Sequence, residues 1–368
     1  MAPERDIAVS MRDGNPLGPG VADAPAREST PFQFIIRFAL TLSISDADVV
    51  ALSRMDRIVE AVESAALEEH DGLVIMPERS NLMHERTLLR IMSAYLRRSG
   101  VFGYKSFHGS MAKGVRYMIV LCRESDGEIL ALLDAAHLTG LRTGATSAVA
   151  TKYMAREGPA TVGLIGSGLE ATTNLAAVAT VRPIERGWVY SRNSDRRKEF
   201  ARRVREEMGI EFLAVDTPDA AVRDASIVLV ATNTGYGGPV AYRGEWLRHG
   251  QHVVSIGSTS PFLREVDSAT FDRADRVVFD APVAQIFRES GDLMAVEEPL
   301  RTRLHTDTAM LPSVVAAGPS KRGLGEISLF KSVGTAAQDI ASAKAIYDLA
   351  LELGIGREIG ELTAPKLF

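Results

Sequence analysis

The 368-residue sequence has a single cysteine and no long run of apolar residues. One cysteine excludes an intrachain disulfide framework and fits a reducing compartment, so we expect a cytoplasmic protein. That residue, Cys122, ends an apolar, strand-like run, and we interpret it as a core residue rather than a nucleophile. No apolar run reaches the roughly 18 residues that a membrane span needs, so we expect no membrane contact.

Basic clusters and metal-ligand spacings are also missing. The formal net charge is −5 and the pI is near 5.9, which argues against a nucleic-acid-binding surface. The seven histidines show no metal-ligand spacing, and we expect no metal site. With 46% apolar and 24% charged residues, the composition is that of an ordinary globular protein. Its length predicts two domains, or one domain interrupted by another.

The first 30 residues are rich in proline, glycine, alanine and charge and lack a hydrophobic h-region. We therefore expect a disordered tail rather than a signal peptide. The segments that follow are predicted as a strand at residues 34–43, a helix at 45–69 with Ser45 or Asp46 as N-cap, an amphipathic helix at 83–98, a hairpin of strands 116–123 and 129–134, and a helix at 143–156.

A glycine-rich turn between an apolar strand and a small-residue helix is the most informative local pattern. Residues 161–165 predict the strand, Gly166-Ser-Gly168 follows, and residues 169–181 predict the helix. Gly166 permits the tight turn, Gly168 lets the backbone approach a pyrophosphate, and Ala171 allows close helix–strand packing. The helix N-terminus offers free N–H groups to the phosphates. The pattern predicts a dinucleotide site, the alternative being an ordinary glycine-rich turn.

The next predicted strand ends without the acidic residue that NAD-preferring sites usually carry. It ends at Ser191, with Arg192 and Asn193 directly after it and Arg196 and Arg197 close behind. Serine and arginine suit a 2′-phosphate, because guanidinium binds phosphate bidentately. The pattern favours NADP(H), with NAD(H) as the alternative if the arginines belong to a solvated helix face.

Further strands at residues 227–231, 252–256 and 276–280 alternate with helical stretches, and a long alanine-rich helix follows Gly334. This alternation predicts an α/β fold with a doubly wound parallel sheet. The simplest architecture is a Rossmann domain at about residues 156–320. It is inserted into a second α+β domain formed by residues 31–155 and 321–368.

Three basic residues precede the nucleotide segment in suggestive local settings. Arg79 follows Met76-Pro-Glu, Lys105 lies in Phe102-Gly-Tyr-Lys-Ser106, and Arg142 lies in the helix that leads to the nucleotide segment. Each of them alone reads as a surface charge.

Together with the rest of the chain, these residues resemble the ornithine cyclodeaminase/μ-crystallin family. The likeness covers about residues 40–356 and rests on several motifs in the same order. They are Asp134-(x)4-Thr139-(x)2-Arg142-Thr143-(x)2-Thr146-Ser147-Ala148, Gly166-Ser-Gly168, Arg264-Glu265-Val266-Asp267, Glu289-Ser-Gly-Asp-Leu293 and Phe330-Lys-Ser-Val-Gly-(x)4-Asp339.

The resemblance implies a homodimer whose non-nucleotide domain supplies the substrate pocket and the subunit interface, with small α-imino or α-amino acids as substrates. By this likeness Arg79 and Arg142 bind the α-carboxylate, and Lys105 is the catalytic group at the reacting C–N centre. Burial beside two arginines lowers a lysine pKa and allows proton transfer. The likeness also assigns cofactor contacts to Leu169, Glu170, Thr232, Ser255, Gly257, Ser258 and Val333.

Two positions depart from the family pattern. Ornithine cyclodeaminases carry an aspartate after the Gly257 strand, where this sequence has Thr259, which is no general base near neutral pH. Ornithine cyclisation is therefore doubtful. The second departure is the segment Lys113-Gly-Val-Arg-Tyr-Met118, which differs from the loop that the family often has there. In this segment, Arg116 or Tyr117 either reshapes the substrate pocket or simply packs in a sheet.

The leading hypothesis is an NAD(P)-dependent imino acid reductase or amino acid dehydrogenase that transfers hydride at the α-carbon. The enzymatic alternative is an ornithine cyclodeaminase-type ammonia-lyase with recycled NAD. The third is a non-catalytic, crystallin-like protein that binds NADPH or another ligand, although such a binder needs no proton-transfer lysine.

Overall fold

The computed structural model describes residues 41–110, 113–319, 323 and 325–366. The tail expected at residues 1–30 and the part of the first expected strand before residue 41 lie outside the described residues.

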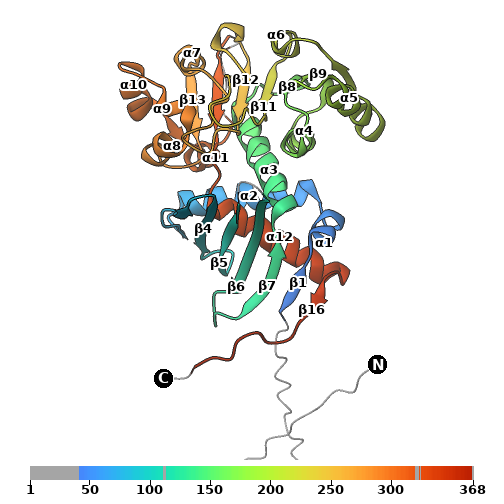
Figure 1. Cartoon of the computed structure of the whole chain (residues 1–368), viewed down its shortest axis with the longest axis vertical. Helices are drawn as coiled ribbons and strands as arrows, with labels where there is room; N and C mark the ends of the chain where they lie inside the picture. The colour runs from blue at the N-terminus through green and yellow to red at the C-terminus, as the bar shows by residue number, and fades with distance from the viewer. Residues whose placement is uncertain (1–40, 111–112, 320–322, 324, 367–368) are drawn as a thin grey trace, which may run out of the picture. The chain divides into compact units, whose positions relative to one another are not determined.

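A mixed eight-stranded sheet is built from segments on both sides of the nucleotide-binding part of the chain (Figure 1). Its order is β16-β1-β7-β6-β5-β4-β2, with β3 paired to β4. The bounds are β1 (Leu42–Ile44), β2 (Val74–Ile75), β3 (Ser80–His84), β4 (Thr87–Leu96), β5 (Val101–Ser110), β6 (Gly114–Arg123), β7 (Ile129–Asp134) and β16 (Arg357–Glu358). The pairs β3–β4, β4–β5, β5–β6 and β6–β7 are antiparallel, whereas β1 runs parallel to β7.

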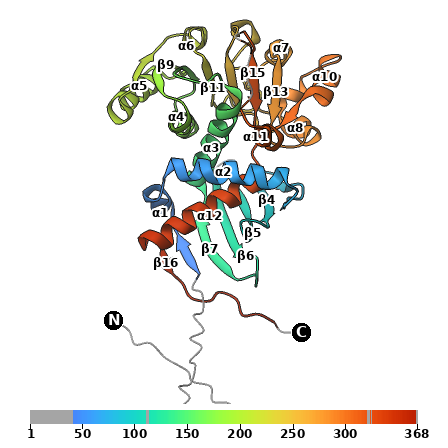
Figure 2. The same ribbon diagram turned by 180° about the vertical axis from the view of Figure 1, so that it is seen from behind.

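Helices α12 (Ala336–Leu353) and α2 (Met55–His70) lie on one side of this sheet, as Figure 2 shows from behind. Helix α12 packs on β4, β5 and β6, and α2 packs on α12. The close approach of α12 is visible at Gly103, where an added Cβ would lie 2.1 Å from the Val120 carbonyl oxygen and 3.2 Å from Ile340. A Thr335–Gln338 capping box begins α12, and Gly354 in the left-handed conformation ends it.

The expected hairpin at residues 116–123 and 129–134 is confirmed by β6 and β7. The helix expected at residues 83–98 is wrong, because this segment forms the end of β3 and the whole of β4. Its leucines and methionines also fit a helical spacing, and the turn that separates the strands, Glu85-Arg86, lacks the usual Asn-Gly signal. Glu85 nevertheless adopts a φ of 48°. Pairing with β5 over ten residue pairs overrides the local pattern.

The helix expected at residues 45–69 is two helices, α1 (Asp46–Ala51) and α2, separated by Leu52-Ser-Arg54. Ser45 is the N-cap of α1, and it forms a capping box with Asp48. Helix α3 (Ala136–Met154) begins seven residues before the expected start at Thr143. It runs from the end of β7 to the segment before β8 (Figures 1 and 2).

The second sheet is parallel throughout, which confirms the predicted α/β class. Its order is β10-β9-β8-β11-β12-β15-β13-β14. Successive strands are therefore added toward one edge of the sheet up to β10 and toward the other edge from β11 onward. The bounds are β8 (Ala160–Ile165), β9 (Ile184–Tyr190), β10 (Glu211–Ala214), β11 (Ile227–Val230), β12 (His252–Ser255), β13 (Arg276–Phe279), β14 (Ala309–Met310) and β15 (Ser328–Lys331). Such a reversal creates a crevice at the carboxyl ends of the strands.

Helices flank the parallel sheet, and they are α4 (Leu169–Val181), α5 (Ser194–Met208), α6 (Pro218–Val222), α7 (Ser268–Arg273), α8 (Val283–Glu289), α9 (Gly291–Met294), α10 (Leu300–Asp307) and α11 (Leu311–Ala317), with a 3-10 turn at Gly244–Trp246. The sheet does not stop at residue 320, the expected end of the nucleotide domain. Strand β15 lies between β12 and β13, and all of its residues are buried. Burial on both faces is typical of a central parallel strand. The division into domains otherwise stays a prediction.

Helix α3 lies against α4 at the junction of the two sheets. An added Cβ at Gly144 of α3 would lie 2.5 Å from the Thr173 carbonyl oxygen of α4, so this crossing depends on glycine. Over the described parts of the chain, none of the helices has the length and apolar character needed to cross a membrane.

Candidate functional site

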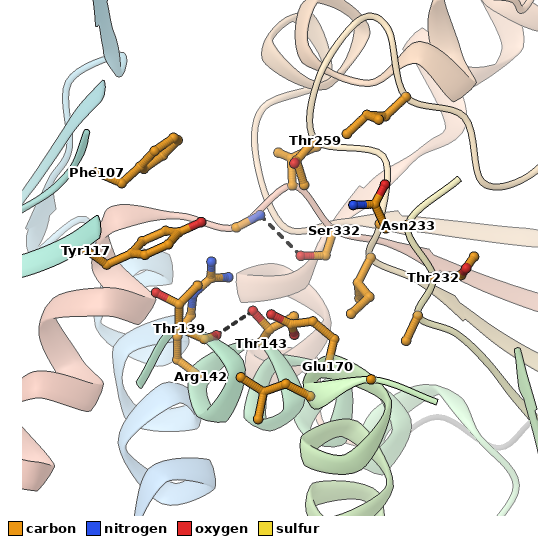
Figure 3. Close-up of a pocket in the computed structure, with 18 of the residues that line it drawn as sticks. Phe107, Tyr117, Thr139, Arg142, Thr143, Glu170, Thr232, Asn233, Thr259 and Ser332 are labelled. Atoms are coloured by element: carbon orange, nitrogen blue, oxygen red, sulfur yellow. Dashed lines mark hydrogen bonds between the residues drawn. The ribbon is translucent and has the colours of Figure 1, made fainter. Parts of the chain in front are cut away.

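A cavity of about 620 Å³ opens at the carboxyl ends of β8, β9, β11 and β12, opposite β4, β5, β6 and α3. In Figure 3, Phe107 and Tyr117 border it on one side, Thr232, Asn233 and Thr259 border it on the other, and Arg142 lies with Glu170 below them. The predicted site residues that line it are Arg79, Lys105, Arg142, Gly168, Leu169, Glu170, Ser191, Arg192, Asn193, Arg196, Thr232, Gly257, Thr259 and Val333.

The glycine turn has the geometry that a phosphate-binding turn needs. Gly166 has a φ of 121°, and an added Cβ would lie 2.1 Å from the Ala231 carbonyl oxygen, so only glycine fits there. Gly168 is the N-cap of α4, and no side chain caps the helix. An added Cβ at Gly168 would meet no atom within 4 Å, which leaves the first N–H groups of the helix open to an anion.

A buried carboxylate holds the two central strand ends together. Glu265 accepts hydrogen bonds from the backbone N–H groups of Thr232 (3.0 Å) and Gly257 (2.7 Å). It also accepts one from the Ser255 hydroxyl at 2.7 Å. Burial raises the pKa of Glu265 to about 7, partly offset by Lys331.

Ser255 and Ser258, which were expected to contact the cofactor, do not line the cavity. The Ser255 hydroxyl is buried between Glu265 and Lys331, and the Ser258 hydroxyl donates to the Leu263 carbonyl oxygen. Gly166 also lies behind the cavity wall, where it shapes the turn.

The end of β9 presents two arginines to the cavity. Arg192 donates to the Asn233 carbonyl oxygen at 3.1 Å, and Arg196 lies in the first turn of α5, whose N-cap is Asn193. Arg197 is engaged elsewhere, since it contacts the Ser191 carbonyl oxygen and the Asp216 carboxylate.

On the opposite wall, Lys105 of β5 is almost completely buried and bonds to Asp339 of α12, with 2.7 Å between Nζ and Oδ1. The same oxygen lies 2.9 Å from Nε of Arg142. Burial lowers the pKa of Lys105 to about 8, an effect that Arg142 and Arg79 add to and Asp339 opposes. A buried lysine with a lowered pKa is a candidate for proton exchange near neutral pH.

Arg79 reaches the same place from the segment between β2 and β3. Its Nη2 donates to the Gly334 carbonyl oxygen at 2.7 Å, and its Nε lies 3.0 Å from Oε1 of Glu289. The Gly334 loop is held by Asp280, which accepts from the backbone N–H groups of Val333 and Gly334 at 3.0 and 2.9 Å. An added Cβ at Gly334 would collide with the Arg142 guanidinium.

Strand alternation brings further residues to the cavity that the sequence reading missed. Because β4 pairs with β5, Arg90 lies opposite Phe107 and Met92 lies opposite Lys105. All four share the face that meets α12, and all four line the cavity. Reading residues 83–98 as a strand would have placed Arg90 and Met92 beside Lys105. The alternatives for Arg116 and Tyr117 also separate here, since Tyr117 lines the cavity and its neighbour points to the other face.

Glu170 occupies the second position of α4 and faces the two cationic groups. Burial raises its pKa, and Arg142 and Lys105 oppose that shift. Its Oε2 is buried and has no hydrogen-bond partner among the residues that the structure describes.

The residues present fit a nicotinamide dinucleotide. The uncapped start of α4 suits a pyrophosphate, and the cavity continues from Arg192 at one end to Val333 and Lys105 at the other. The described part of the chain contains no group of three or more His, Cys, Asp or Glu side chains placed to hold a metal ion.

Comparison with known proteins gives a match to the ornithine cyclodeaminase/mu-crystallin family over residues 41–354. The chain belongs to this family. It is 36% identical over 250 residues to a Delta(1)-pyrroline-2-carboxylate reductase of Bacillus cereus, an alignment that covers 67% of this chain and 75% of that protein.

Solved structures agree with this assignment. The Thermococcus litoralis Delta(1)-pyrroline-2-carboxylate reductase in complex with NADH and L-proline superposes with a TM-score of 0.78 at 33% identity, and the match covers 87% of this chain and all (100%) of that chain. An archaeal alanine dehydrogenase dimer with bound NAD gives 0.77 at 30% identity, and covers 87% and 98% of the two chains. The first of these structures contains NADH and L-proline, and the second contains NAD.

Proposed function

We propose that this protein is an NAD(P)H-dependent reductase of small α-imino acids, which also oxidises the matching α-amino acids in reverse. The observation that carries the proposal is the buried Lys105–Asp339 pair beside Arg142, in one cavity with the uncapped start of α4. A crystallin-like binder would need the cofactor turn and an anion site but no buried lysine with a lowered pKa.

The roles of the residues follow from their positions. The start of α4 and the wall at Val333 would hold NAD(P)H, and the chemistry that this cofactor would supply is a hydride for the imine carbon. Arg79 and Arg142 hold the α-carboxylate, since each guanidinium keeps N–H groups beyond its contact with the protein. Lys105 gives its proton to the imine nitrogen, whose C=N π electrons have become a lone pair, and the product is the amine. Asp339 holds the ammonium in place and keeps it charged.

We further propose that the coenzyme is NADP(H). Arg192 and Arg196 border the cavity at the end of β9, the strand end that usually meets the adenosine ribose. No acidic side chain occupies the strand end itself, which reads Tyr190-Ser-Arg192. We also propose a homodimer in the cytoplasm.

The test is oxidation of NADPH or NADH, followed at 340 nm, with a panel of imines. The panel contains Δ1-pyrroline-2-carboxylate, Δ1-piperideine-2-carboxylate, and pyruvate or glyoxylate with ammonia or methylamine. We expect turnover that is faster with NADPH than with NADH. Lys105→Met should lower it by about 100- to 10,000-fold, the usual contribution of a general acid. Lys113→Met, a matched change at an exposed residue, should leave it unchanged.

Other outcomes point elsewhere. Release of ammonia from ornithine or lysine with no net change in cofactor would mark a cyclodeaminase. Tight NADPH binding without turnover of any imine or amino acid would mark a binding protein.

A further inference from the structure

Arg90 is the feature of the cavity that this function leaves unused. Four cationic side chains, Arg79, Arg90, Lys105 and Arg142, line the part of the cavity where the substrate is proposed to bind. Three of them have carboxylate partners. Arg79 pairs with Glu289, and Lys105 and Arg142 share Asp339. Within the described residues, no carboxylate forms an ion pair with Arg90, whose Nε donates to the Asn81 amide oxygen at 2.5 Å.

The position of Arg90 follows from the register of the sheet. Arg90, Phe107 and Tyr117 form one row across β4, β5 and β6. The neighbouring row on the same face contains Met92 and Lys105. Rows two residues apart lie about 7 Å from each other along a strand, so Arg90 is roughly a short substrate's length from the catalytic lysine.

The orientation of the side chain leaves its binding edge open. The guanidinium carbon of Arg90 lies over the Phe107 ring, 4.9 Å from its centroid, so a cation–π contact holds the group against the aromatic wall. The Asn81 bond uses Nε, and the terminal nitrogens have no bond to protein within the described residues. Burial and the nearby Arg79 lower the pKa of Arg90, and Glu289 opposes that shift without forming an ion pair with Arg90. The site therefore carries a positive charge at an energetic cost.

We propose that Arg90 binds a second carboxylate, and that the preferred substrate is a dicarboxylic α-imino acid of four or five carbons. The proposal rests on the proposed function, because it assigns the α-carboxylate to Arg79 and Arg142 and the imine nitrogen to Lys105. A distal carboxylate pairs with this guanidinium, with which no carboxylate of the described residues forms an ion pair; Glu289, the acidic group nearby, is paired with Arg79. A monocarboxylic imine leaves that charge unpaired. The distal group takes no part in the hydride or proton transfer, so the reaction balances as before.

The test compares substrates that differ only at the distal carbon. Oxaloacetate is compared with 2-oxobutyrate and 2-oxoglutarate with 2-oxopentanoate, each with excess ammonia, and omission of ammonia controls for ketone reduction. We expect the wild-type kcat/KM to favour each dicarboxylate by at least about tenfold, because bidentate charge-assisted bonds are strong. Arg90→Gln should lower kcat/KM for the dicarboxylates by about 10- to 100-fold and change that for the monocarboxylates by less than about threefold.

Arg86→Gln is the matched control, since it removes the same charge from the exposed turn between β3 and β4. It should leave the preference intact. Equal or better use of the monocarboxylates by the wild type would overturn the proposal. An equal loss for both classes in Arg90→Gln would also overturn it, because that result marks a residue that only supports the sheet.

A binding measurement separates this proposal from the proposed function. Succinate and butyrate, at matched ionic strength and with NADPH present, are compared as stabilisers in thermal unfolding. We expect succinate to raise the Tm of the wild type and not of Arg90→Gln. If succinate does so while no imine is turned over, the reductase assignment fails and the dicarboxylate site stands. If succinate has no effect beyond that of butyrate, the dicarboxylate site fails, whatever the turnover.

Discussion

In the proposed mechanism, the proton comes from a lysine that is buried and lies near two guanidinium groups. In water, a lysine near pH 7 holds its proton too tightly to exchange it efficiently. Here, burial and two guanidiniums lower the pKa of Lys105 to about 8, while Asp339 keeps the charged form bound. The balance between these groups sets the pH at which the lysine can act.

The pH dependence of imine reduction tests this balance. Because the protonated lysine is the acid, we expect kcat/KM for reduction to fall as pH rises through about 8, and amino acid oxidation to rise over the same range. Asp339→Asn removes the neighbour that raises the pKa of Lys105, so its falling limb should move to lower pH. The measurement is a pH profile of both enzymes with the same imine. A limb that stays in place or moves upward would contradict the role of Asp339.

At the scale of elements, the site depends on how closely α3 approaches α4. Helix α3 carries Arg142, and α4 begins at the uncapped Gly168 turn. Two glycines of α3 face α4, but they differ in what an added Cβ would meet. At Gly144 it would meet the Thr173 carbonyl oxygen at 2.5 Å, and at Gly140 the Leu169 side chain at 3.3 Å. A side chain such as that of Leu169 can move aside for an added methyl group, whereas the backbone of Thr173 cannot.

Alanine substitutions in α3 test this crossing. In an ordinary helix interior, replacing glycine by alanine stabilises by about 0.5–1 kcal/mol. We expect Gly144→Ala to reverse that sign and destabilise by about 1–3 kcal/mol, since it overpacks the crossing. Gly140→Ala should be close to neutral, because Leu169 can shift. Denaturant unfolding measures both variants. A stabilised Gly144→Ala would show that the helices can separate freely.

At the scale of the whole molecule, the helices of the described residues that pack on the antiparallel strands of the first sheet lie on one of its faces. Helix α12 packs on that face, and α2 packs on α12. On the opposite face of the sheet, apolar side chains such as Ile91 and Tyr104 are exposed. Leu82 and Met83 of β3 are exposed as well. Exposed apolar surface gathered on one sheet is typical of an interface between subunits.

We therefore expect the purified protein to have twice the mass of the 39.8 kDa chain in light scattering after size exclusion. Tyr104→Glu places a charge on the proposed interface and should shift the mass toward that of the single chain. Leu213→Glu alters an exposed leucine of β10, on the other sheet, and should leave the dimer intact. A single-chain mass for the wild type would contradict the dimer.

The sequence alone determined the features that are local in the chain. Gly166 and Gly168 predicted the turn, because strand, glycines and helix follow one another and each glycine has a backbone reason. The alternation of strands and helices predicted the parallel sheet, and the ordered motifs predicted the family. The same motifs proposed Arg79, Lys105 and Arg142 as site residues, and all three line the cavity.

Only the tertiary structure decided what depends on pairing between distant segments. Residues 83–98 fit a helix until β5 is present, and the strand that forms instead brings Arg90 to the face of Lys105. Asp339, from α12, sets the lysine pKa from the far end of the chain. Ser255 and Ser258 lie at strand ends, as cofactor contacts do, yet buried hydrogen bonds turn both hydroxyls away from the cavity. Register and burial are long-range properties, and no local spacing encodes them.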